Sequence, residues 1–164
     1  MGMIDLLEAF AAHCDGVETM SMDDAHRLAD IMGDKPVRDA LLYIALYKRT
    51  PQQAMLYMHP KACDAEVKRF MDEAWNASQP PIDGERLDHA LDAFSTLAQA
   101  RPELSTPHSC AADILWWCGR PQKAFVEIFE AATCDSEDSL AHIVFAGLKN
   151  NIMPPCAKGA HDGR

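Results

Sequence analysis

The chain lacks both a long apolar run and a basic opening segment. Its longest apolar runs, such as residues 40–47, are far shorter than the roughly 20 residues that a membrane helix needs. The first residues carry an acid at Asp5 and no cation, which is not the pattern of a secretory signal. We therefore expect a cytoplasmic protein that neither crosses nor binds a membrane.

Strand patterns and the common catalytic motifs are also missing. No segment alternates apolar and polar residues with the β-branched bias of a strand. Glycine-rich phosphate loops, nucleophile elbows and C-x-x-C pairs are absent as well. With 48% apolar and 24% charged residues, the composition is that of an ordinary globular domain. The sequence predicts an all-α protein that is not an enzyme and has no cofactor.

Histidine and cysteine lie close together three times, at His13-Cys14, His59-x-x-x-Cys63 and His108-x-Cys110. A zinc site needs ligands that converge, usually from two short-spaced pairs, and no second well-spaced pair accompanies any of these. We therefore predict no metal. Without a secretory signal, the six cysteines are expected to be reduced thiols that pack as small hydrophobic side chains.

Charge is unevenly distributed along the chain, whose net charge is −10. Residues 1–34 carry a balance of −7, residues 35–69 a balance of +4, and the remainder −7. An acidic chain repels nucleic acid at long range, because phosphate binding depends on clustered cations. The segment 35–69 either presents a local basic face or is solvated and paired with its acidic flanks.

Helix signals recur along the chain and predict about eight helices. Ser21 with Asp24 forms a capping-box-like start, Thr50-Pro51 repeats a cap followed by proline, and Asp135 is expected to cap the last helix. The predicted architecture is one domain over 1–155, with N-terminal helices over 3–76 and a second part over 82–152. Residues 156–164 are expected to be a disordered tail.

The second part shows the repeat spacing of a helical stack. Ala90 and Phe94 recur as Ala124 and Ile128, an offset that equals the tetratricopeptide period. Small residues at such positions let two helix axes approach closely, although any amphipathic helix pair also supplies alanine at intervals. We predict a tetratricopeptide-like hairpin over 107–133 within an irregular right-handed stack of antiparallel helix pairs.

The same region carries a set of marks that resembles a known family. They are Trp116-x-x-Gly119, Ala124, Glu130-Ala131-Ala132, Asp135, Ser139-Leu140-Ala141 and, upstream, Asp34-x-x-Val37-Arg38-Asp39-Ala40. This set resembles the C-terminal part of the actinobacterial Domain of Unknown Function 4192 family. The chain departs from the family at Gly119-Arg120-Pro121, where Gly-Asp-Gly is usual, and at Asp135-Ser136, where Asp-Pro is usual. The resemblance implies lineage and fold but no activity.

Two groups of residues are candidates for binding. Trp116 and Trp117 are adjacent, so on a helix they point about 100° apart; either both are core residues or one faces a partner groove. The second group consists of the cations Lys48, Arg49, Lys68 and Arg69, with tyrosines interleaved, a combination that binds nucleic acid in other proteins.

A third, weaker candidate is a set of carboxylates. Glu85, Asp88 and Asp92 share one helix face, which is expected to point to water rather than to do acid–base work.

These observations favour a helical module that binds another protein or a second copy of itself, without catalytic activity. The alternative is a regulatory, nucleic-acid-associated protein that uses the basic segment 35–69. The sequence ranks this alternative lower, because the chain as a whole is acidic.

Overall fold

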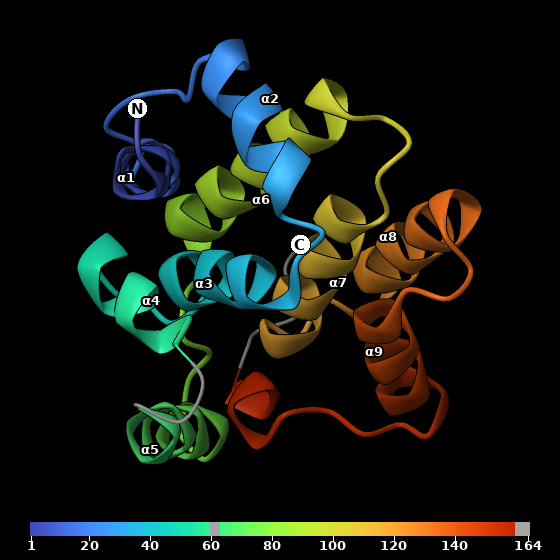
Figure 1. Ribbon diagram of the computed structural model, residues 1–164. Coiled ribbons are helices and arrows are strands. Elements are labelled where there is room, and N and C mark those ends of the chain that lie inside the picture. The colour runs from blue at the N-terminus through green and yellow to red at the C-terminus, as the bar shows by residue number, and fades with distance from the viewer. Residues whose placement is uncertain (60–62, 160–164) are drawn as a thin grey trace.

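The computed structural model describes residues 1–59 and 63–159, and this part of the chain is all-helical (Figure 1). The helices in chain order are α1 (Met3–Cys14), α2 (Met22–Ile31), α3 (Lys35–Ala45), α4 (Pro51–Tyr57), α5 (Asp64–Trp75), α6 (Gly84–Ala100), α7 (Thr106–Trp117), α8 (Pro121–Cys134), α9 (Ser139–Lys149) and the 3-10 helix η1 (Pro155–Gly159). The all-α prediction is confirmed. Within the described residues, no helix has both the length and the apolar composition needed to cross a bilayer.

Capping side chains fix several of the helix starts. The Ser21 hydroxyl accepts a hydrogen bond from the Asp24 backbone N–H at 3.1 Å, which confirms the predicted start of α2. Thr50 and Gln53 form a complete capping box at α4, so two otherwise unpaired N–H groups are satisfied. The prediction for the last helix was wrong, because Asp138 and not Asp135 accepts from the Ala141 N–H.

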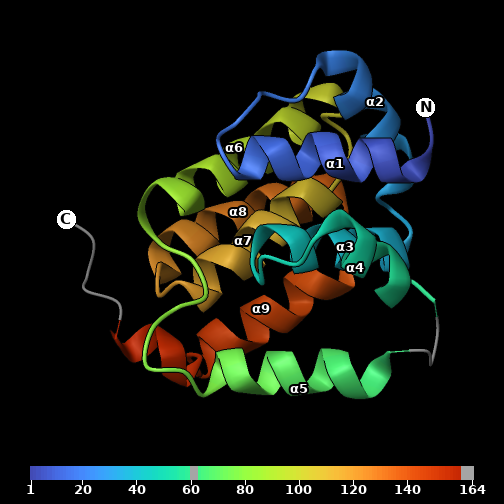
Figure 2. The same ribbon diagram turned by 90° about the vertical axis from the view of Figure 1, so that its left-hand side faces the viewer.

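Helix α7 lies at the centre of the molecule and is enclosed by its neighbours (Figures 1 and 2). It packs against α3, α6, α8, α9 and η1, and almost all of its residues are buried. Helix α8 follows after a short turn at Gly119, whose φ of 72° suits a residue without a side chain. Helices α7 and α8 are the most extensively packed pair in the described structure.

Helices α1 and α2 pack on α6 and cover one side of the core (Figure 2). The Phe10 and Phe94 rings meet edge to face at 5.2 Å between centroids, the geometry that aromatic pairs prefer. Buried His13 accepts a hydrogen bond from the Met20 N–H at Nδ1. Its Nε2–H therefore donates to Asp92 Oδ2 at 2.7 Å, and this bond ties α1 to α6.

Helix α5 lies along the opposite edge in both views and is held by aromatic contacts (Figures 1 and 2). The Phe70 ring packs against Tyr43, Tyr47 and Tyr57 at centroid distances of 5.3–5.8 Å. Trp75 packs against both tryptophans of α7. The interleaved tyrosines therefore belong to this aromatic cluster.

The C-terminal segment also packs against the core. Residues 155–159 form η1, with Cys156 fully buried and Ala157 7% exposed. The predicted disordered tail was therefore wrong for residues 156–159, because these apolar side chains reach the space between α5 and α7. Residues 160–164 of the predicted tail lie outside the described residues.

Candidate functional site

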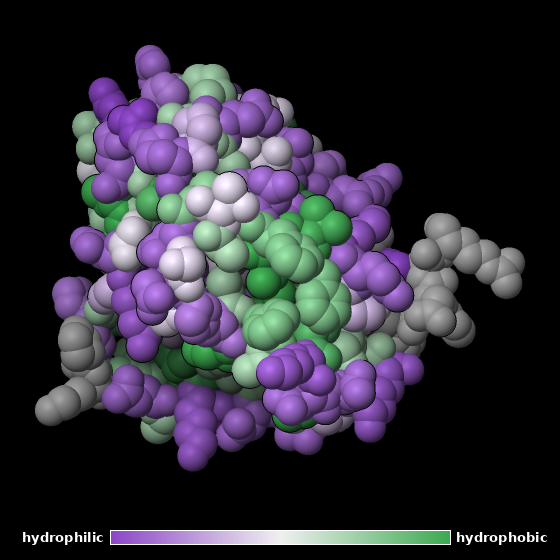
Figure 3. Space-filling view, turned by 90° about the vertical axis from the view of Figure 1, so that its right-hand side faces the viewer, coloured by the Kyte–Doolittle hydropathy of each residue, from purple (hydrophilic) through white to green (hydrophobic). Residues whose placement is uncertain are grey.

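An exposed apolar surface covers the outer side of α8 and α9 (Figure 3). Its four principal side chains are Phe129, Ile143, Val126 and Phe145, which are 69%, 60%, 59% and 42% exposed. We call these four residues the α8–α9 surface. Phe129 and Phe145 line one groove between the two helices, whereas Val126 and Ile143 lie outside that groove on the flanks of α8 and α9. Isolated exposed apolar residues are normal in proteins, but several on neighbouring helices are typical of an interaction site.

The α8–α9 surface contains a groove with a cavity volume of about 240 Å³. The floor is made by Ile128 and Ala141, which are buried, and aromatic rings form the sides. The Phe125 ring of α8 meets the Phe145 ring of α9 edge to face at 6.3 Å. Asp135 and Ser136, in the turn between the two helices, supply the polar rim.

The local sequence explains why this surface is apolar. In α8, Ala124, Ile128 and Ala131 form the buried stripe, yet Val126 and Phe129 add apolar side chains outside it. In α9 the same excess occurs at Ile143 and Phe145. A surface helix needs only one apolar stripe to pack against its domain. Apolar residues beyond that single stripe are visible in the sequence, and they indicate a second apolar side on each helix.

The two tryptophans do not contribute to any exposed surface. Trp116 and Trp117 are 8% and 5% exposed, and the Trp116 indole N–H donates to the Ile152 carbonyl at 2.9 Å. Both lie in the core because α7 is enclosed on several sides at once. Of the two alternatives for Trp116 and Trp117, the structure therefore supports the one in which both are core residues, and their candidacy as binding residues is corrected.

The four candidate cations are not gathered in one place. Lys48 and Arg49 line a cleft beside α6, whereas Lys68 and Arg69 are exposed on α5 and do not line it. The Arg49 guanidinium lies 4.3 Å from the centroid of the Phe70 ring, a cation–π contact that joins the α3–α4 turn to α5. Residues 60–62 of the basic segment lie outside the described residues.

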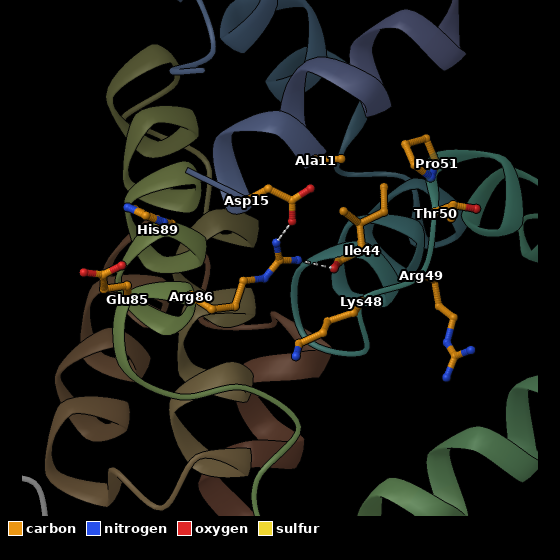
Figure 4. Close-up of a pocket in the computed structure, with 10 residues that line it drawn as sticks. All are labelled: Ala11, Asp15, Ile44, Lys48, Arg49, Thr50, Pro51, Glu85, Arg86 and His89. Carbon is orange, nitrogen blue, oxygen red and sulfur yellow. Dashed lines mark hydrogen bonds and ion pairs between the residues drawn. The ribbon is translucent and has the colours of Figure 1, made fainter. Parts of the chain in front are cut away.

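The cleft beside Lys48 has a volume of about 510 Å³ and mixed charge (Figure 4). The Arg86 guanidinium donates to the Asp15 carboxylate and to the Ile44 carbonyl, so it joins α6 to α1 and α3. The Arg49 side chain points away from the cleft and toward α5 (Figure 4). Glu85 lines the cleft while Asp88 and Asp92 do not, so the three aligned carboxylates do not converge there.

A buried carboxylate lies elsewhere, at Asp113 in the middle of α7. It is 8% exposed, and burial raises the pKa of this carboxyl from 3.8 to about 7. The Arg38 guanidinium opposes the rise in pKa and the Asp39 carboxylate adds to it. Arg38 donates two hydrogen bonds to Asp39, so its charge is shared between the two carboxylates. Sequence spacing alone gave no sign of this burial.

The cysteines and histidines form no shared centre in the part of the chain that the structure describes. Within it, no group of three or more His, Cys, Asp or Glu side chains could hold a metal ion. All six cysteines are unpaired. Burial raises the pKa of the Cys14 and Cys118 thiols to about 12, so both stay protonated and unreactive.

Comparison with protein-family models, with curated proteins and with solved structures gave no match to this chain. The resemblance to the actinobacterial Domain of Unknown Function 4192 family therefore stays a prediction.

Proposed function

We propose that this protein is a cytoplasmic helical module that binds another protein through the α8–α9 surface and has no catalytic activity of its own. The observation that carries the proposal is the exposure of Phe129, Ile143 and Val126, each 59–69% exposed, on two neighbouring helices. Large aromatic and aliphatic side chains of this kind form the centres of protein interfaces. The tetratricopeptide-like character of the α7–α8 hairpin is part of the same proposal.

The size of the apolar surface supports a binding site of modest strength. Its four side chains together expose the equivalent of about two complete side chains. Full burial of a large apolar side chain stabilises by about 1.5–3 kcal/mol, so this surface could contribute roughly 3–7 kcal/mol. Association costs at least about 4 kcal/mol in lost freedom. The partner must therefore offer an apolar surface of its own.

The experiment compares capture of partners by three forms of the full chain. Tagged wild-type protein should retain a specific partner, Phe129→Asp should lose it, and Val17→Asp should keep it. Val17 is a suitable control because it is 79% exposed in the turn after α1, outside the α8–α9 surface. Equal retention of the same partners by wild type and Phe129→Asp would contradict the proposal.

The nucleic-acid alternative has one supporting observation, which is that Lys48 lines a cleft of about 510 Å³. Arg49 borders the same cleft, but its guanidinium lies against Phe70 of α5 (Figure 4). The alternative loses the expected stacking platform, because Tyr47 is 8% exposed and packs against Phe70. Binding to nucleic acid should fall steeply with salt if it exists. A mobility shift that Lys48→Glu abolishes would favour this alternative.

A further inference from the structure

We propose that the partner of the α8–α9 surface is a second copy of this chain, with the two α9 helices antiparallel across a two-fold axis. The inference rests on the proposed function and names the partner of the same surface. Two features of α9 carry it, its apolar composition and the placement of charge at its two ends.

Helix α9 is apolar on nearly every side. Its described sequence, SLAHIVFAGLK, contains one cation, Lys149, and one histidine. One side packs on α7 and α8, while Ile143, Phe145 and Ala146 are exposed. Phe145 lies on the flank toward α8, and Ile143, two residues earlier, lies on the opposite flank. A helix that is apolar all round is normally enclosed on all sides. The described chain covers α9 on one side only, so the outer side is open to a further element.

The charges at the ends of α9 favour a copy of the same helix as that element. Lys149 is exposed at the C-terminal end, and Glu137 is exposed just before the N-terminal end. Within the described residues neither side chain forms an ion pair. In a parallel pair of α9 helices, like charges would face each other. In an antiparallel pair, each Lys149 faces the Glu137 of the other copy.

The antiparallel arrangement also brings apolar side chains of the two copies together. Ile143 lies midway between Glu137 and Lys149 in the sequence, so the two-fold axis passes near it and the two Ile143 side chains meet. Antiparallel helix dipoles attract, since each positive N-terminus lies beside a negative C-terminus. The remaining polar side chain on this side, His142, already bonds to the Ser136 carbonyl at 2.6 Å, so it does not require a partner.

Sedimentation equilibrium on the full chain tests the association. Between about 10 µM and about 1 mM protein, a range that brackets weak dimers, the average mass of the wild type should rise from 18.1 kDa toward twice that value. Ile143→Asp should raise the Kd at least about 30-fold, as expected for a central interface residue, and Val17→Asp should leave it unchanged. A wild type that stays monomeric throughout overturns the proposal.

Charge reversal tests the antiparallel geometry. Lys149→Glu alone and Glu137→Lys alone each place like charges together twice, and each should weaken the dimer at least about threefold. An equimolar mixture of the two variants restores both opposite-charge contacts and should dimerise as well as the wild type. A mixture that dimerises no better than either variant alone overturns the proposal.

The partner-capture experiment separates this inference from the proposed function. If wild type is monomeric but Phe129→Asp loses capture of a different protein, the second-copy inference is overturned and the interaction module stands. If wild type is monomeric and capture is insensitive to Phe129→Asp, both are overturned.

Discussion

Replacement of Asp113 by asparagine should stabilise the protein at neutral and alkaline pH. The buried carboxyl has a pKa near 7 in the fold, against 3.8 as its ordinary value, chiefly because burial disfavours the charged form. The folded state therefore binds the proton more tightly than the unfolded state. The stability associated with this proton is complete below about pH 4 and is lost as the pH rises toward 7.

The pKa difference sets the size of the expected effect. A shift of about three pKa units at 1.36 kcal/mol per unit corresponds to about 4 kcal/mol, lost once the pH exceeds 7. Asparagine has the same shape and no charge, so Asp113→Asn removes this cost. We expect the variant to gain up to about 4 kcal/mol over wild type at pH 8, and close to nothing at pH 4.

Urea unfolding at the two pH values measures the difference directly. The midpoint difference between Asp113→Asn and wild type should be large at pH 8 and should shrink toward zero at pH 4, with the m-values unchanged. Asp88→Asn is the matched control, because Asp88 is an exposed helical aspartate on α6. A difference between Asp113→Asn and wild type that is the same at both pH values would refute the reasoning.

Three other substitutions test contacts within the fold. Arg86→Met removes the hydrogen bonds that tie α6 to α1 and α3, and should lower the free energy of unfolding by about 1–3 kcal/mol. Gly147→Ala places a Cβ 2.8 Å from the Trp116 ring, and the overpacking should outweigh the better helix propensity by about 1 kcal/mol. The Glu127 hydrogen bond raises the pKa of His108, so Glu127→Gln should lower that pKa in an NMR titration. The same variant should lose more stability at pH 5 than at pH 9, because the pair stabilises only while His108 is charged.

Controls and contrary outcomes for these substitutions are direct. Gly33→Ala is the control for Gly147→Ala, because a Cβ at Gly33 meets no atom within 4 Å. An Arg86→Met variant as stable as wild type would contradict the account of the cleft. An unchanged His108 titration in Glu127→Gln would show that the ion pair does not set its pKa.

The fold was largely predictable because local signals agree with the packing. Ser21 and Thr50 mark the helix starts through their capping bonds, and apolar stripes give the buried faces. Which helices surround α7, and therefore which of its residues are buried, could not be predicted in this way. Whether Trp116 and Trp117 are both buried depends on which helices surround α7, and that arrangement is set by contacts between segments distant in the sequence.

The candidate site was only partly predictable for the same reason. Trp116 and Trp117 were expected at an interface because tryptophan is common there. In the part of the chain that the structure describes, however, the most exposed Phe, Tyr or Trp side chain is Phe129. Its exposure follows from the second apolar side of α8, which a count of apolar residues beyond one stripe would have found. The burial of Asp113 arises from α3 and α7 together, and their approach leaves no local pattern.

The most direct test of the central claim is site-specific photo-cross-linking in the cell that makes the protein. Benzoylphenylalanine placed at Phe129 should give a distinct heavier product, and the same group placed at Val17 should not, although both positions are highly exposed. A product at Phe129 alone is the result that the account predicts. Equal cross-linking from both positions, or none from Phe129, would contradict the claim that the α8–α9 surface binds a protein.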